Sequence, residues 1–134
     1  MKRLITVGLL ILFLASGLAF AEHKGKICVA TKEKSQEASV SDRAGLAPYF
    51  LVFDQKGDLI EIIDNPFKER KFEAGHLIAN FLPEKGITAI IGTDFCGEIV
   101  EVLKNRGLTP YNFQGSAKEA AERVSQGKVP VATK

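Results

Sequence analysis

The chain has 134 residues, of which 46% are hydrophobic and 25% charged, which is the size and composition of one globular domain. It carries 18 lysines and arginines and 16 acidic residues, for a formal net charge of +2. Binding to nucleic acid depends mostly on cations that contact phosphates, so this near-neutral balance, with no stripe of cations, argues against a nucleic-acid partner.

The first 21 residues have the pattern of a secretory signal peptide. Lys2 and Arg3 precede an apolar run that begins at Leu4 and ends in Ala19-Phe20-Ala21, which predicts cleavage after Ala21. Cleavage lowers the 18 cations to 16, equal to the 16 acidic residues. We therefore expect a neutral protein that is periplasmic or secreted. The alternative is an uncleaved membrane anchor, because residues 4–21 are just long enough to span a membrane. A membrane is an expected partner only in that case.

Three strands are predicted in the first half of the folded part. Residues 26–30 form a short apolar run that is typical of a buried strand. The segment from Thr31 to Pro48 has many charges and no clean period, so we expect a mobile loop at the rim of a binding site, in which the less charged second half, residues 39–48, can be ordered. Tyr49–Phe53 and Leu59–Ile63 are aromatic and β-branched runs around a polar turn, which predicts a β-hairpin.

Three helices and two strands are predicted in the second half. Apolar side chains at helical spacing indicate the helices, and short β-branched or aromatic runs indicate the strands. The expected elements are a helix from Gly75 that Pro83 ends, a strand over 88–91, a helix from Cys96 to Gly107, a strand over 108–113, and a helix from the capping box of Ser116 and Glu119 to Gly127. Residues 128–134 are expected to form a flexible tail.

The alternation of strands and helices after the hairpin predicts parallel βαβ units, in which helices cover the faces of a sheet. The expected fold class is α/β, with one domain over residues 22–127. We expect a mixed sheet of about five strands, two of them from the hairpin, together with three helices.

Four segments resemble one known protein family, over essentially all of residues 26–127. They are the strand end Ala30-Thr31, the loop Ser41-Asp42-Arg43-Ala44-Gly45-Leu46-Ala47-Pro48-Tyr49-Phe50, the helix start Glu73-Ala74-Gly75-His76, and the strand Gly86-Ile87-Thr88-Ala89-Ile90-Ile91. The family is the dinitrogenase iron–molybdenum cofactor biosynthesis domain, which is related to nitrogen fixation. The resemblance implies a three-layer fold similar to ribonuclease H. It also implies a role in carrying, delivering or inserting iron–sulfur and iron–molybdenum cofactors.

The chain is identified as a divergent, exported member of that family, because it departs from the family pattern in three places. The family's His-Phe-Gly-Arg segment is replaced by Arg43-Ala44-Gly45-Leu46, so one imidazole is missing while the glycine is kept. The glycine-rich segment after the fourth strand is reduced to Gly92-Thr93-Asp94-Phe95-Cys96-Gly97. The family is generally cytoplasmic, whereas this chain has a leader.

His76 and Cys96 are the candidate metal ligands. Each is expected at the start of a helix, and ligand crevices in α/β sheets lie beside the carboxyl ends of strands. A helix N-terminus favours the thiolate form of a cysteine, which is the form that binds metals. Imidazole and thiolate together suit an iron–sulfur cluster, an iron–molybdenum-type cluster or a single transition metal. The alternative is that Cys96 packs in the core and His76 is an ordinary surface residue.

Five further residues are candidates for cofactor binding. Arg43 and Gly45 belong to the loop that carries the resemblance, and Gly75, Gly92 and Thr93 lie near expected helix starts. Backbone N–H groups at helix starts bind small anionic ligands without special side chains. Ordinary helix capping is the alternative explanation for these residues.

No arrangement of residues indicates catalysis, since the chain has neither a nucleophile-elbow motif nor a phosphate-binding glycine loop. We therefore expect a non-enzymatic carrier of a metal or a metal cluster, with a protein acceptor as a further partner. The alternative is an interaction domain whose cofactor site has decayed and which holds no metal. Cys28 lies in an expected core strand, and whether it pairs with Cys96 stays open.

Overall fold

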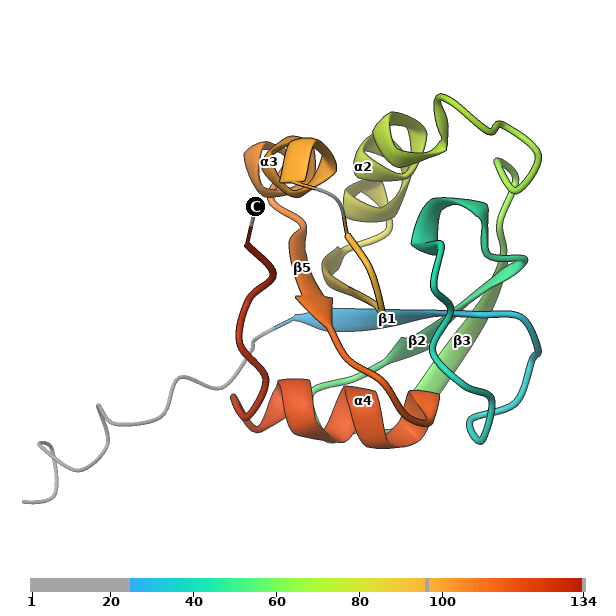
Figure 1. Ribbon diagram of the computed structural model, residues 1–134. Helices are drawn as coiled ribbons and strands as arrows, with labels where there is room; N and C mark the ends of the chain where they lie inside the picture. The colour runs from blue at the N-terminus through green and yellow to red at the C-terminus, as the bar shows by residue number, and fades with distance from the viewer. Residues whose placement is uncertain (1–24, 96, 134) are drawn as a thin grey trace, which may run out of the picture.

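A computed structural model describes residues 25–95 and 97–133, which form a mixed β-sheet between two layers of helices (Figure 1). A short 3₁₀ turn, η1, follows the first strand. In chain order the elements are β1 (Lys26–Thr31), η1 (Ala44–Leu46), β2 (Tyr49–Phe53), β3 (Leu59–Asp64), α2 (Ala74–Glu84), β4 (Ile87–Gly92), α3 (Gly97–Asn105), β5 (Thr109–Asn112) and α4 (Ala117–Ser125).

The sheet has five strands in the order β3-β2-β1-β4-β5, so β1 lies at its centre. β1 pairs antiparallel with β2 and parallel with β4, β4 pairs parallel with β5, and β2 pairs antiparallel with β3. The predicted hairpin and the predicted parallel βαβ units are both confirmed. So is the expected α/β fold class, a three-layer arrangement similar to ribonuclease H with a mixed sheet and three helices.

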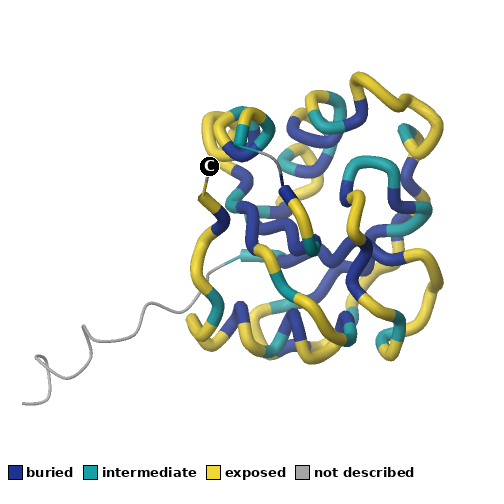
Figure 2. Tube along the Cα trace, in the orientation of Figure 1, coloured by how far each residue is buried: buried dark blue, intermediate teal, exposed yellow. Residues whose placement is uncertain are grey.

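Alternation along the strands builds a hydrophobic core on each face of the sheet (Figure 2). On β1, Cys28 and Ala30 face the layer formed by α2 and α3, and they pack in one core with Ile78 and Leu103. Ile27 and Val29 face the opposite way, and they pack in a second core with the buried alanines of α4. The helices of the two layers therefore cover opposite faces of one sheet.

The ends of the helices agree in part with those predicted from the sequence. The N-cap half of the predicted capping box is confirmed at α4, where the Ser116 hydroxyl accepts the N–H of Glu119 at 3.2 Å. The prediction that Pro83 ends α2 is wrong, because the helix continues through it to Glu84. Proline has no N–H to donate to the carbonyl four residues earlier, and its ring crowds that carbonyl. At Pro83 only one residue of the helix follows, so the helix loses one hydrogen bond there. The longest described helix has 11 residues, and none is long and apolar enough to cross a membrane.

The loop after β1 and the C-terminal tail are both tied to the sheet by backbone hydrogen bonds. In the loop after β1, the N–H of Ser41 donates to the Ala30 carbonyl at 2.7 Å, and the N–H of Val40 donates to the Gly115 carbonyl at 2.9 Å. The expected flexible tail returns to β5, where the N–H of Ala132 donates to the Pro110 carbonyl at 2.8 Å. Because β5 is an edge strand, its outer backbone groups are available to pair with the tail.

Candidate ligand-binding site

The carboxyl ends of the parallel strands β1, β4 and β5 meet at one edge of the sheet, where ligands bind in many α/β proteins. The loops that follow these strands enclose two neighbouring cavities, which share Asp42. The first cavity lies between the loops after the three strands, and the second lies between η1 and the starts of α2 and α3.

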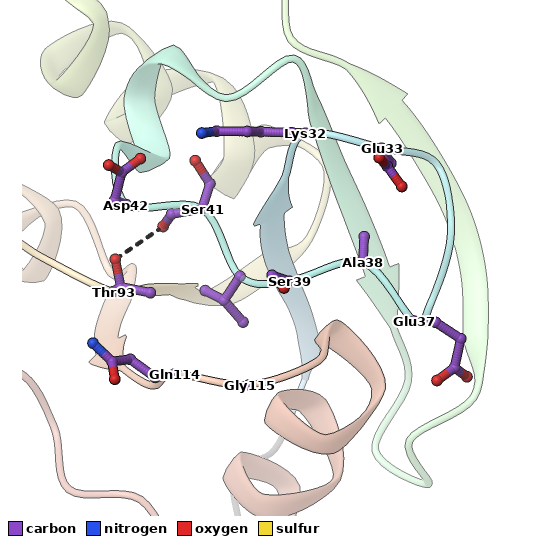
Figure 3. Close-up of a pocket in the computed structure, with 11 residues that line it drawn as sticks. Lys32, Glu33, Glu37, Ala38, Ser39, Ser41, Asp42, Thr93, Gln114 and Gly115 are labelled. Atoms are coloured by element: carbon purple, nitrogen blue, oxygen red, sulfur yellow. Dashed lines mark hydrogen bonds between the residues drawn. The ribbon is translucent and has the colours of Figure 1, made fainter.

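The first cavity has a volume of about 580 Å³. Most of the residues that line it have polar side chains (Figure 3). Its walls carry one cation, Lys32, together with acidic and hydroxyl side chains. The lining residues are Lys32, Glu33, Glu37, Ala38, Ser39, Val40, Ser41, Asp42, Thr93, Gln114 and Gly115. The backbone N–H and the hydroxyl of Thr93 donate to the Ser41 carbonyl at 3.1 and 3.5 Å. Thr93, a predicted cofactor residue, therefore joins the loops that follow β1 and β4.

The second cavity has a volume of about 720 Å³ and contains most of the residues that the sequence analysis selected. Arg43, Gly45, Gly75 and His76 all line it. Its other lining residues are Asp42, Ala44, Leu46, Lys71, Phe72, Ala74, Ile78, Asp94, Phe95, Glu98 and Ile99. The loop and the helix start that the sequence selected thus line one cavity, together with side chains before α2 and at the start of α3 that the sequence analysis did not select.

The predicted glycines shape the walls of this cavity by allowing close approach. A Cβ atom on Gly45 would lie 3.1 Å from the Cβ of Ala74, and one on Gly75 would lie 2.8 Å from Cγ1 of Ile99. Gly75 therefore lets α2 pack directly against α3. At the end of β4, a Cβ on Gly92 would lie 3.1 Å from Cζ of Phe95. A side chain at Gly75 would require Ile99 to move, whereas at Gly45 and Gly92 the neighbouring groups would have to shift by a few tenths of an ångström.

Asn65 fixes the wall formed by η1. Its side chain is 2% exposed and donates to the carbonyl oxygens of Gly45 and Ala47, both at 2.8 Å. The same side chain accepts the N–H of Phe67 at 2.9 Å. Asn65 therefore connects η1 to the segment that leads into α2. Sequence reasoning did not select Asn65, because a hydrogen-bonding role across the fold has no local signature.

His76 lies exposed at the second cavity, in the first turn of α2. The N–H groups of Gly75 and His76 have no hydrogen-bond acceptor within the described part of the chain, as is usual at a helix start. Such N–H groups are available to an anionic ligand. Cys96 lies outside the described residues. Phe95, directly before it in the sequence, and Glu98, two residues after it, both line the second cavity.

Cys28 is fully buried in β1, and burial raises the pKa of its thiol well above the usual range. The thiol therefore stays protonated and is a poor metal ligand. Whether Cys28 pairs with Cys96, which the sequence leaves open, concerns a residue outside the described part of the chain, since only Cys28 is described.

The described walls of the second cavity carry one imidazole, that of His76, together with charged side chains of both signs. Within residues 25–95 and 97–133, no three His, Cys, Asp or Glu side chains are placed to hold a metal ion. A cluster brings its own inorganic ligands and needs fewer from the protein. The described walls carry two cations, Arg43 and Lys71, and three carboxylates, Asp42, Asp94 and Glu98. Side-chain charge therefore selects neither anions nor cations, and the free helix N–H groups are the feature that favours anions.

Comparison with known proteins gives a family and related structures. Residues 25–127 match the profile of the family described as dinitrogenase iron-molybdenum cofactor. The apo form of the orange protein from Desulfovibrio gigas has a similar structure, with a TM-score of 0.72 and 23% sequence identity, covering 84% of this chain and 96% of that protein. A candidate NifB protein from Thermotoga has a TM-score of 0.67 and 26% identity, covering 82% and 95%. A search of curated proteins returned no match.

Proposed function

The chain belongs to the dinitrogenase iron–molybdenum cofactor family, and on this basis we propose that it is a non-catalytic carrier of a preassembled metal cluster. The cargo is an iron–sulfur or iron–molybdenum-type cluster, held in the second cavity and passed to a protein acceptor. Family membership supports a role connected with such cofactors. The cargo and the carrier role are inferred from the cavity.

The observation that carries this proposal is the position of His76 at the second cavity. The imidazole, together with the free N–H groups of Gly75 and His76, lies beside a space of about 720 Å³. An imidazole binds iron and other transition metals, while the N–H groups suit the sulfides or oxygens of an anionic cluster. Cys96, in the same segment as Phe95 and Glu98, is the proposed second protein ligand.

A cluster accounts for the site better than a single ion does. A transition metal that is bound only by protein needs about four ligands, and the described residues, which do not include Cys96, do not bring three together, so even with Cys96 this proposal counts only two protein ligands. Two protein ligands are sufficient to hold a cluster whose remaining metal coordination is inorganic. Weak attachment through few ligands also suits a carrier, because the cargo must leave again.

We propose further that the carrier acts outside the cytoplasm. The pattern that ends in Ala19-Phe20-Ala21 supports export, since the small residues Ala19 and Ala21, at the −3 and −1 positions, suit cleavage by signal peptidase. The family match begins at residue 25, after the expected cleavage site. The family-related part of the chain therefore lies within the mature protein that this cleavage would produce.

The test is the metal and sulfide content of the protein, purified without oxygen and incubated with ferrous iron, sulfide and molybdate. We expect stoichiometric metal and sulfide in the unmodified protein and a loss of at least about 10-fold in occupancy in the His76→Ala/Cys96→Ser variant. His23→Ala is the matched control, because the other histidine of the chain precedes residues 25–127, which match the family.

Two results would count against the proposal in different ways. Metal and sulfide that remain in His76→Ala/Cys96→Ser would place the cargo elsewhere in the molecule. No metal or sulfide in the unmodified protein would favour the alternative, an interaction domain whose cofactor site has decayed. The replacement of the family's His-Phe-Gly-Arg segment by Arg43-Ala44-Gly45-Leu46 is the observation that favours this alternative.

A further inference from the structure

Phe72 is the most exposed large apolar side chain of the described residues. It lies in the segment between β3 and α2, and 96% of its surface is open to solvent. The next most exposed, Ile60 on the edge strand β3, has 48% of its surface exposed. Burial of an aromatic ring is strongly favourable, so a ring held almost fully in water is suited to a partner that covers it.

The second cavity, which Phe72 borders, has the complementary character. Leu46, Ile78, Phe95 and Ile99 contribute apolar side chains to its walls. Its volume of about 720 Å³ is ample for an aromatic ring. The ring of Phe72 in the same molecule does not fill this space, because it is almost entirely exposed.

The charges around the cavity also differ between its two sides. Lys71 precedes Phe72 on the side of α2, whereas Asp94 and Glu98 lie on the side of α3. A two-fold axis that runs between these sides brings the α2 side of one molecule against the α3 side of another. The cation of each copy then faces carboxylates of the other, and each aromatic ring faces an apolar wall. An interface of this kind is complementary to itself.

We propose that the chain forms a symmetric dimer in which Phe72 of each copy enters the second cavity of the other. Lys71 of each copy pairs with Asp94 and Glu98 across the interface. In the dimer, the second cavity of each copy is covered by the other copy. The dimer does not require a cargo, so its test is independent of the carrier function. A bound cluster and the ring of the second copy occupy the same cavity, so loading favours the monomer.

The charges near Phe72 favour a protein surface over a membrane as its partner. Lys68 and Lys71 are accompanied by Glu69 and Glu73, and Arg70 forms an ion pair with Glu73. Attraction to anionic lipid requires a cluster of uncompensated cations. A ring of mixed charges around an aromatic residue is typical of protein interfaces.

The experiment is sedimentation equilibrium of the metal-free protein, purified as the cell makes it, from micromolar to millimolar concentration. We expect a concentration-dependent dimer whose Kd rises by at least about 100-fold in Phe72→Ser, because two rings lose their burial. Since Phe72 contacts little of its own fold, this variant should stay folded. Ile62→Ser is the matched control, because its side chain is also exposed but lies on β3, and we expect it to leave the Kd unchanged.

Charge reversal identifies the geometry of the interface. Lys71→Glu and Glu98→Lys should each weaken the dimer by about 10-fold, and the two together should restore it, since the opposite charges are exchanged. A monomer at every concentration would overturn the proposal. A dimer that survives Phe72→Ser, or that is lost in Ile62→Ser, would also overturn it and would indicate pairing through the β3 edge.

Discussion

Replacement of Asn65 by alanine should cost more stability than replacement of almost any other polar residue in the chain. The side chain of Asn65 makes three hydrogen bonds: a buried one to Ala47 at 2.8 Å, and two partly buried ones to Gly45 and Phe67 at 2.8 and 2.9 Å. Asn65→Ala leaves the carbonyls of Gly45 and Ala47 and the N–H of Phe67 without these partners. Each unsatisfied buried group costs about 1–3 kcal/mol, and water that enters the gap recovers part of this. We therefore expect a loss of about 3–5 kcal/mol in the free energy of unfolding.

The assay is urea denaturation followed by circular dichroism. With a slope of about 2 kcal/mol per molar urea, this loss lowers the midpoint by about 2 M. Asn80→Ala is the matched control, because Asn80 is exposed on α2, and its cost should stay within about 0.5 kcal/mol. A cost below about 1 kcal/mol for Asn65→Ala would refute the reasoning, since it would mean that η1 does not depend on these bonds.

Asn65→Asp distinguishes the hydrogen-bond argument from a loss of packing, because the two side chains have nearly the same shape. At neutral pH the carboxylate faces the carbonyls of Gly45 and Ala47, which raises the pKa of the new carboxyl. The variant should be about as unstable as Asn65→Ala at pH 7 and should regain stability as the pH falls and the carboxyl becomes a donor. Equal stability at pH 4 and pH 7 would contradict this explanation.

Three further predictions concern packing, ionisation and processing. Gly75→Ala should lower the melting temperature and reduce the free energy of unfolding by about 1–3 kcal/mol, because the new Cβ meets Ile99. Adding Ile99→Val to this variant should recover part of the lost stability. Burial raises the pKa of the Cys28 thiol from 9.0, so urea titrations should show full stability below pH 9 and a decline at higher pH that Cys28→Ala reduces. Intact-mass measurement of the exported protein should give a chain that begins at Glu22, whereas a retained leader would contradict cleavage after Ala21.

The sequence predicted the fold wherever the signals were local. Tyr49–Phe53 and Leu59–Asp64 form the expected hairpin because both runs are aromatic or β-branched and a short polar turn joins them. The tail and the loop after β1 were expected to be mobile, but they are tied by backbone bonds such as that of Ala132 to Pro110. Pairing of this kind depends on where a strand edge lies in space, and no residue type indicates it.

Sequence reasoning found part of the candidate site and missed the residues whose role depends on how the chain folds. Arg43, Gly45 and His76 belong to a loop and a helix start that the sequence identified, and the structure brings them to one cavity. Asn65 was not recognised, because its two carbonyl partners lie 18 and 20 residues earlier in the chain. Phe72 was not recognised either, because the sequence shows an aromatic residue but not whether the fold buries it.

The carrier function is tested most directly by nuclear magnetic resonance of isotope-labelled protein, before and after incubation with ferrous iron, sulfide and molybdate. Paramagnetic iron broadens the signals of nearby amides, so the spectrum locates the cargo without any substitution. We expect broadening to be confined to the segments around Gly45, His76 and Phe95, with α4 on the opposite face of the sheet unaffected. Broadening that is centred elsewhere, or a spectrum that does not change, would contradict a cluster site in the second cavity.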